Sequence, residues 1–208
     1  MSINYDLSLA SSMRFFPIWD RDNISQITGL INLIEYVFDT NPDSPNWVEV
    51  GTLCGESASI MLGFSKIKKL DCIDSWTICP GYVNSATPGD FRSAKNIFFA
   101  RLSQHINTKR CVPYHLDSIS ASKLYVDNSI NVVYVDADHN YDFVLSDLET
   151  WFPKVKPGGF LCGHDYHVIS DAWPDVKRAV DDFVIKYSLE SPILFEDSSF
   201  LLRKQWGA

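Results

Sequence analysis

The sequence lacks several features that would each assign it to a class of protein. It has no run of about eighteen apolar residues, the length that a membrane-spanning helix needs, so we expect no membrane partner. Residues 1–6 have neither a basic start nor an apolar core, which argues against a signal peptide. Lys and Arg number 18 against 26 Asp and Glu, and the net charge of −8 repels phosphate backbones, which disfavours nucleic acid as a partner.

Cysteines are few and scattered. There are five of them, an odd number, and no Cys-x-x-Cys pair occurs. Cys54, Cys72 and Cys162 lie in or beside apolar runs, where a thiol packs as a small hydrophobic group. Because this pattern fits free thiols better than a disulfide framework, we expect a reducing, cytoplasmic location.

Length and composition indicate one globular domain. A chain of 208 residues builds one sizeable core but not two comfortable ones. The hydrophobic share of 46% and the charged share of 21% are those of an ordinary folded protein. We expect a single domain over residues 1–208, with its core in 46–204 and an N-terminal helical, substrate-capping segment in 1–45.

The spacing of apolar residues alternates between helix and strand along the chain. The predicted helices are residues 23–39, 56–64, 91–106, 143–152 and 175–187. The predicted strands are residues 47–50, 70–74, 111–116, 130–135 and 160–163, followed by a terminal hairpin of 193–196 and 200–203. This order predicts an α/β fold, a Rossmann-like doubly wound sheet of about seven strands, mostly parallel, with an antiparallel C-terminal hairpin.

Polar residues cluster where the predicted strands end. In open parallel sheets, ligands bind beyond the carboxyl ends of the strands. In this chain those positions are residues 49–55, 74–76, 115–118, 136–139 and 164–166. We therefore expect the functional site along this edge of the sheet.

The turn after the first strand carries glycines, and the second strand ends in an acid. Gly51 and Gly55 permit positive φ and let a ligand approach the backbone. The turn is not Gly-x-Gly-x-x-Gly, so the dinucleotide fingerprint is absent. Asp74 stands where a carboxylate accepts hydrogen bonds from the ribose hydroxyls of an adenosine ligand. Each feature alone fits a plain turn or an exposed loop acid, but together they predict a nucleoside ligand.

These residues resemble the motifs of the class I S-adenosylmethionine-dependent methyltransferases, over roughly residues 46–204. Glu49-x-Gly51-x-x-x-Gly55 resembles the first motif of that family, and residues 133–141 resemble its fourth-strand motif. The resemblance implies S-adenosyl-L-methionine as cofactor. The residues that it implies for cofactor binding are Glu49, Gly51, Thr52, Gly55, Asp74, Ser75, Trp76, Asp117, Ser118 and Asp136.

A longer spaced pattern is similar to the macrocin and catechol O-methyltransferases. The pattern runs Asp136-x-Asp138-His139-x-Tyr141, Asp147-Leu148-x-x-Trp151, Pro157-Gly158-Gly159 and Gly163-His164-Asp165-Tyr166. The similarity implies an O-methyltransferase that acts on a small hydroxylated molecule. We expect a sugar or a glycosylated metabolite as the methyl acceptor.

His139, Asp136 and Asp165 are the candidates for catalysis. A hydroxyl is a weak nucleophile while it is protonated, so a base or a metal is expected beside it. His139 follows the fourth strand and is our first choice for the base, although a structural loop histidine fits the same position. Asp136 and Asp165 end neighbouring strands, so their carboxylates could hold Mg²⁺ or another divalent cation.

The resemblance supports a metal only in part. Relatives in the macrocin and catechol groups use acids at such positions, but this chain has His164-Asp165-Tyr166 where they carry a second acid or an amide beside the first. Without a metal, Asp136 would orient the ammonium group of the donor and Asp165 would position the substrate. His164 or His167 could instead complete a site for a borderline metal.

Two segments are free to shape the acceptor pocket. Residues 76–90 form a predicted long loop, and residues 15–19 carry three aromatic rings. The same rings fit equally well under the first helix or against a second subunit, so a homo-oligomer stays open. Arg92 and Lys95 follow the loop, where they could meet an anionic group or simply face solvent.

Three other functions compete with methyl transfer. A nicotinamide-dependent oxidoreductase shares the sheet, but Gly-x-Gly-x-x-Gly and Tyr-x-x-x-Lys are missing. A metal-dependent hydrolase using Asp136, His139 and Asp165 would leave the glycines and Asp74 without a role. A non-catalytic binding protein that retains the fold stays open, because a fold does not determine a function.

Overall fold

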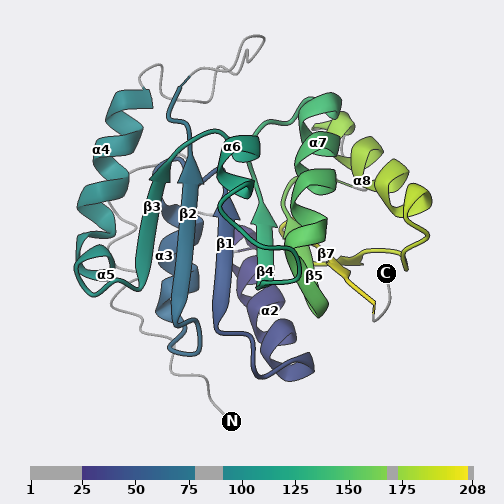
Figure 1. Cartoon of the computed structure of the whole chain (residues 1–208), viewed down its shortest axis with the longest axis horizontal. Helices are drawn as coiled ribbons and strands as arrows, with labels where there is room; N and C mark the ends of the chain where they lie inside the picture. Colours follow the sequence, from purple (N-terminus) through teal and green to yellow (C-terminus); the bar gives the residue numbers. More distant parts are fainter. Residues whose placement is uncertain (1–24, 78–90, 168–172, 206–208) are drawn as a thin grey trace.

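A seven-stranded mixed sheet forms the centre of the molecule (Figure 1). The structure is a computed structural model, and it describes residues 25–77, 91–167 and 173–205. The strands are β1 (Asn46–Val50), β2 (Lys69–Asp74), β3 (Cys111–His115), β4 (Ile130–Val135), β5 (Val155–Gly163), β6 (Ile193–Leu194) and β7 (Phe200–Arg203). Their order is β3-β2-β1-β4-β5-β7-β6. Strands β1 to β5 are parallel and the β7–β6 pair is antiparallel, so the predicted fold class is confirmed.

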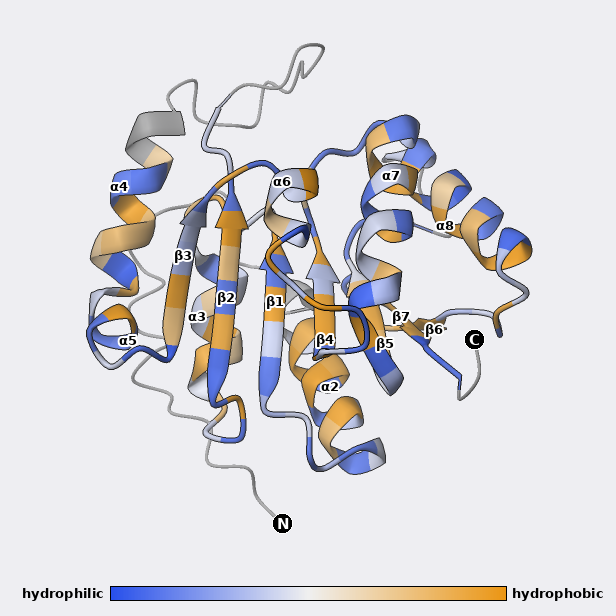
Figure 2. Ribbon diagram, viewed as in Figure 1, coloured by the Kyte–Doolittle hydropathy of each residue, from blue (hydrophilic) through white to orange (hydrophobic). Residues whose placement is uncertain are grey.

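Helices cover both faces of the sheet (Figure 1). The α-helices are α2 (Ser25–Thr40), α3 (Glu56–Gly63), α4 (Phe91–Arg101), α5 (Ser103–Asn107), α6 (Ser118–Ser122), α7 (Tyr141–Trp151) and α8 (Pro174–Lys186), and a 3₁₀ turn, η2, spans Phe152–Lys154. Helices α2, α3 and α4 pack on one face, and α6, α7 and α8 on the other. Figure 2 shows mixed colours along α7 and α8, as expected for helices with one buried side.

Successive side chains along a strand point to opposite faces of the sheet, so each strand contributes apolar residues to two cores. Trp47 packs with α2 and α3 on one face, whereas Val48 and Val50 pack with α7 and α8 on the other. Strand β4 is buried at every position, as a central parallel strand should be. The apolar, β-branched sequence that predicted this strand therefore reflects burial on both faces.

Strand β5 begins earlier than predicted. We expected a turn over residues 156–159 and a strand from Phe160, but β5 starts at Val155. The expected turn is a bulge within the strand, since Ile130 pairs with Val155 but Val132 pairs with Phe160. Gly158 takes a positive φ of 77° there, and its backbone N–H donates to the carbonyl of Lys204 at 2.8 Å.

Two helices also differ from the prediction. The expected helix 91–106 is divided at Leu102, whose fully buried side chain packs close to Gly55. The short helix α6 was not predicted, because five residues are too few to show a periodic apolar pattern. The expected substrate-capping residues before Ser25, the predicted loop beyond Thr77 and the side chain of Arg92 lie outside the described residues. Among the described helices, none is long and apolar enough to cross a membrane.

The buried side chain of Lys204 ties the end of β7 to the bottom of the sheet. It is 4% exposed, and its Nζ donates to Asn128 Oδ1 at 2.9 Å and to the carbonyls of Val155 at 3.0 Å and Phe152 at 3.2 Å. Burial lowers the pKa of Lys204. The ammonium group thus satisfies acceptors at the point where η2 becomes β5.

We expect Lys204→Met to lower the free energy of unfolding by about 1–3 kcal/mol, because the substitution leaves buried acceptors without a donor. Urea denaturation of the two proteins measures the difference. Lys123→Met, at an exposed position, is the matched control. Equal stability of Lys204→Met and the parent protein would contradict this account of the buried lysine.

Candidate active site

The register of the parallel strands brings four chain segments to one edge of the sheet. Val50 pairs with Ile73 on one side and with Val135 on the other, and Val135 pairs with Gly163. The segments that follow these strands therefore lie side by side at the carboxyl edge of the sheet. They begin at Gly51, Asp74, Asp136 and His164. This is the edge at which the sequence predicted the site.

Gly51 brings the first turn into close contact with the segment that follows β4. It has a φ of 88°, and its N–H donates to the carbonyl of Ile73 at 2.8 Å. A Cβ atom at this position would lie 2.1 Å from the carbonyl oxygen of Asp136, a distance no side chain tolerates. The close approach requires glycine here, and it joins the turn to the segment that carries Asp136 and His139.

Asp74 holds the same turn from the other side. Its Oδ2 accepts a hydrogen bond from the N–H of Leu53 at 2.7 Å, and its Oδ1 accepts one from the N–H of Trp76 at 2.6 Å. Burial raises the pKa of Asp74, and these backbone donors oppose the shift. The backbone N–H of Thr52 is a third donor to this carboxylate. A carboxylate has about four acceptor positions, so one remains for a hydroxyl group of a ligand.

Trp76 supports the turn with its side chain. Its indole N–H donates to the carbonyl of Leu53 at 2.8 Å, and the ring packs against Phe98 with 5.2 Å between centroids. The residue is only 5% exposed. Its neighbour Ser75 offers its carbonyl oxygen to His115 Nε2 at 2.8 Å. The two predicted cofactor residues thus adjoin Asp74, with the Trp76 ring engaged in packing.

Glu49 lies fully buried beneath the turn. Its carboxylate accepts hydrogen bonds from Thr52 Oγ1 at 2.6 Å and from Ser57 Oγ. Burial raises the pKa of Glu49 to about 7, against the opposing effect of the two hydroxyl donors. Glu49 and Thr52 therefore shape the turn from inside, while Gly55 begins α3 with a φ of 74°.

Asp117 and Ser118 stand at the end of β3 and make local contacts. The Asp117 side chain caps α6 by accepting from the N–H of Ser120 at 2.8 Å, which lowers the pKa of Asp117. Ser118 Oγ accepts from the indole N–H of Trp151 at 2.8 Å. Both residues lie on the predicted edge, next to β2. Their side chains form hydrogen bonds with residues of α6 and α7.

Asp136, His139 and Asp165 meet at the ends of β4 and β5. His139 Nε2 lies 2.8 Å from Asp165 Oδ2 and 3.9 Å from Asp136 Oδ1. One ligand atom from each of the three residues lies within 4.8 Å of the others. The structure thus brings together all three predicted catalytic residues in a cluster that could hold a metal ion.

The charges of this cluster are strongly coupled. Burial alone would lower the pKa of His139, but the carboxylates of Asp136 and Asp165 raise it to about 10. His164, 3.2 Å from Asp165 Oδ2, has its pKa raised to about 9 against the same effect of burial. Burial would raise the pKa of Asp165, but the two histidines hold it well below its usual range. At neutral pH, a cation or a proton therefore has to stay between these carboxylates.

His139 is held by packing as well as by charge. Its ring stacks on Trp173 with 4.4 Å between centroids and an angle of 24°. Among the described residues, Nδ1 of His139 has no hydrogen-bond partner, whereas Nε2 pairs with Asp165 Oδ2 at 2.8 Å. No sequence pattern points to Trp173, which caps the start of α8 and lies 34 residues beyond His139 in the chain.

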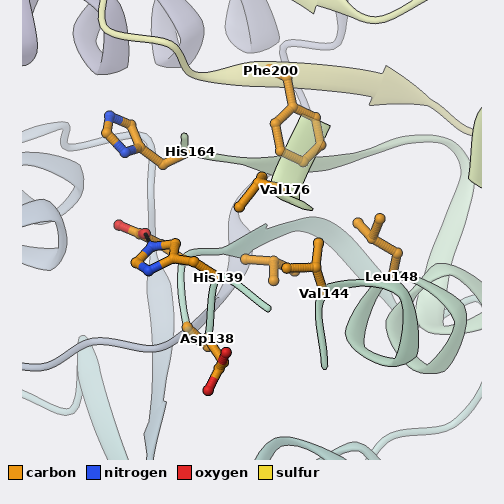
Figure 3. A pocket seen from close by; sticks show the side chains of 10 residues that line it. Asp138, His139, Val144, Leu148, His164, Val176 and Phe200 are labelled. Carbon is orange, nitrogen blue, oxygen red and sulfur yellow. Dashed lines mark ion pairs between the residues drawn. The ribbon is translucent and has the colours of Figure 1, made fainter. Parts of the chain in front are cut away.

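A small cavity of about 10 Å³ opens beside His139, enough for about one water molecule. Figure 3 shows His139 and His164 on one side of it and Val144, Leu148, Val176 and Phe200 toward the other. A space of this size accommodates an ion or a water but no substrate ring. The acceptor therefore has to approach from outside the cavity.

A family model described as a methyltransferase domain matches residues 48–166. The matched stretch runs from β1 to the loop after β5 and contains every predicted catalytic and cofactor residue. The chain is also 32% identical over 158 residues to an uncharacterised protein, R132, of Acanthamoeba polyphaga mimivirus. That match covers 74% of this chain and 66% of the viral protein, so the chain spans slightly less than two thirds of its relative.

Solved structures share the fold at low sequence identity. An O-methyltransferase of Bacillus cereus in complex with S-adenosylhomocysteine has a TM-score of 0.57 at 12% identity, over 95% of this chain and 88% of that one. CalS11, a TDP-rhamnose 3′-O-methyltransferase of calicheamicin biosynthesis, has a TM-score of 0.59 at 17% identity, over 97% and 92% of the two chains. At such identities the likeness concerns the fold alone.

The buried carboxyl of Glu49 gives stability a pH dependence with a definite sign. Its pKa of about 7 in the folded protein exceeds the ordinary value of 4.5, so the folded state binds a proton that the unfolded state releases. Its contribution is complete below pH 4.5 and is lost as the pH rises toward 7. A shift of that size corresponds to about 3 kcal/mol.

Glu49→Gln should remove this contribution, so the stability difference between variant and parent should change between pH 4.5 and 7.5. Urea denaturation at several pH values measures it, and comparing the two proteins cancels the titration of all other groups. Glu190→Gln, at an exposed position, is the control. Parallel stability curves for the parent and Glu49→Gln would show that Glu49 titrates normally.

Proposed function

The chain belongs to the methyltransferase-domain family, and from this premise we propose that it transfers the methyl group of S-adenosylmethionine to a hydroxyl of a small molecule. Family membership makes it an S-adenosylmethionine-dependent methyltransferase, and the hydroxyl acceptor is the proposed part. The observation that carries the proposal is the cluster of Asp136, His139 and Asp165 beside Gly51. Such a cluster provides the proton acceptor that a hydroxyl substrate needs and that a more nucleophilic acceptor does not.

The residues of the first turn and Asp74 fit the cofactor. The Asp74 carboxylate is fixed by backbone donors and keeps an acceptor position for the ribose hydroxyls. Gly51 and Gly55 give the turn its positive φ angles, and Gly55 is packed against the side chains of Phe98 and Leu102. When bound, the cofactor supplies a methyl group that its sulfonium already activates. The protein has to align that group with the acceptor, which is worth roughly 7–11 kcal/mol in favourable cases.

His139 is the base that the geometry supports best. The carboxylates that raise the pKa of His139 to about 10 keep the ring protonated at neutral pH, so His139 accepts the proton of a hydroxyl only after it has lost its own. Its Nδ1, which has no hydrogen-bond partner among the described residues, is then the accepting atom. Trp173 stacks on the ring and Asp165 lies against Nε2, so both fix the direction in which Nδ1 points. The two carboxylates also stabilise the imidazolium that forms when the proton arrives.

A divalent cation is the second way in which the same cluster could act. Nε2 of His139 and the two carboxylates converge within 4.8 Å of one another, an arrangement that a shared cation could hold in place of the proton. The two carboxylates suit Mg²⁺ and Mn²⁺ alike, and the imidazole nitrogen favours a transition-metal ion such as Mn²⁺ over Mg²⁺, which prefers oxygen alone. Bound there, a cation would lower the pKa of an acceptor hydroxyl.

A sugar is the acceptor class that we propose. CalS11, which shares the fold, is described as a TDP-rhamnose methyltransferase, and the subgroup pattern of the sequence is similar to that of the macrocin enzymes. The indole of Trp173 adjoins His139, and aromatic faces pack well against sugar rings. The small-molecule nature of the partner is likewise a proposal.

Asp74→Ala should weaken S-adenosylhomocysteine binding at least tenfold, which is about 1.4 kcal/mol, because the contact with the ribose hydroxyls is lost. Isothermal titration of both proteins gives the dissociation constants. The control is Asp39→Ala, because Asp39 is an exposed acid in α2, away from Asp74 in the sequence. Thermal unfolding without ligand verifies that the variant is folded. An unchanged dissociation constant in a folded Asp74→Ala protein would remove Asp74 from the cofactor site.

His139→Ala should lower turnover by about 10²–10⁴-fold while S-adenosylhomocysteine binding stays unchanged, because the proton acceptor is lost. Transfer of labelled methyl from S-adenosylmethionine to TDP-rhamnose and other nucleotide sugars provides the assay. Activity of the parent protein that persists in chelator supports the base, whereas activity that needs added Mn²⁺ supports the cation. Equal turnover of parent and variant would exclude His139 from the reaction.

A further inference from the structure

Two side chains outside the catalytic cluster form a chain of hydrogen bonds that ends on the Asp165 carboxylate. His167 Nε2 lies 3.3 Å from Asp165 Oδ1, and Ser198 Oγ lies 2.8 Å from His167 Nδ1. His167 and Ser198 both lie beyond residue 166, where the family match ends. The family match therefore does not include these two residues.

The two oxygens of the Asp165 carboxylate have separate partners. Oδ2 faces the cluster, at 2.8 Å from His139 and 3.2 Å from His164. Oδ1 faces His167 on the other side. A carboxylate that is held at one oxygen cannot rotate without breaking that bond, so the contact with His167 determines where Oδ2 points.

The backbone brings these residues together independently of the side chains. Ser198 stands at the tip of the β6–β7 hairpin, and its carbonyl accepts from the N–H of Tyr166 at 3.0 Å. The N–H of His167 donates to the carbonyl of Asp165 at 2.9 Å. Asp165 and Ser198 both adopt positive φ, at 63° and 69°. The hairpin tip is therefore docked on the loop after β5 even when the Ser198 or His167 side chain is replaced.

We propose that Ser198 and His167 are positioning residues that orient the Asp165 carboxylate toward His139. The Ser198 hydroxyl donates to Nδ1 of His167, which fixes the tautomer in which Nε2–H donates to Asp165 Oδ1. Oδ2 is then presented to the cluster. The inference rests on the proposed function in one respect, that Asp165 acts in the reaction. The hairpin tip, outside the matched family domain, thereby becomes part of the active site.

Nuclear magnetic resonance of the imidazole nitrogens tests this arrangement without cofactor or acceptor. The chain has five histidines, and ¹⁵N-histidine labelling reports all of them. His139 and His164 both touch Asp165 Oδ2, so their signals report where that oxygen lies. The proteins to compare, in chelator at one fixed pH, are the parent, His167→Leu, His167→Gln, Ser198→Ala and the control His105→Gln.

His167→Leu should shift the signals of His139 and His164, because Asp165 is released. His167→Gln retains an N–H donor and should leave both signals in place, as should His105→Gln. Ser198→Ala should shift the His167 signals and move those of His139 and His164 less than His167→Leu does. The parent spectrum should show His167 with its proton on Nε2.

Unchanged His139 and His164 signals in His167→Leu would overturn the proposal, since Asp165 would then need no support. Equal shifts in His167→Leu and His167→Gln would also overturn it, because His167 would then act only through packing. Titration of the same proteins with S-adenosylhomocysteine tests the proposed function separately from the positioning role of His167 and Ser198. A parent protein that does not bind it would contradict the proposed function, whereas the spectra still decide the roles of His167 and Ser198.

Discussion

The parallel register of β1 with β2 and β4 is the constraint on which the site depends. It presses the backbone of Gly51 onto that of Asp136 and brings Leu53 within hydrogen-bond distance of Asp74. The turn that fits a nucleoside and the segment that carries His139 are therefore one continuous edge. A change of one residue in this register would separate the predicted cofactor residues from the catalytic cluster.

The second constraint is the repulsion between two carboxylates, which neighbouring histidines in the same cluster offset. Asp136 and Asp165 stand close together in a partly buried place, where two carboxylates repel each other. His139 and His164 neutralise them, and the raised pKa values of both histidines express the same attraction. The fold thus pairs the two negative carboxylates with two positive imidazoles. Loss of a proton from either histidine, or replacement of that proton by a metal cation, changes this pairing of charges.

The sequence predicted the sheet, its order of helices and strands, and the edge that carries the site, because these follow from local spacing and from general rules of parallel sheets. It also predicted that Asp136 and Asp165 converge, since they follow the neighbouring strands β4 and β5, and it named His139 as the base. It did not predict that His139, rather than His164 or His167, completes the cluster. It did not predict Trp173 or Ser198, whose contacts depend on how α8 and the hairpin return to the sheet. The bulge in β5 was missed because the glycine pair is typical of a turn and equally fits a bulge.

The claim that one edge of the sheet serves both cofactor and acceptor is tested most directly by a crystal structure of the protein with S-adenosylhomocysteine. The account predicts that the ligand lies over the Gly51–Gly55 turn, with its ribose hydroxyls on Asp74 and its sulfur directed toward His139. A ligand bound elsewhere, or one whose sulfur points away from Asp136, His139 and Asp165, would contradict the account.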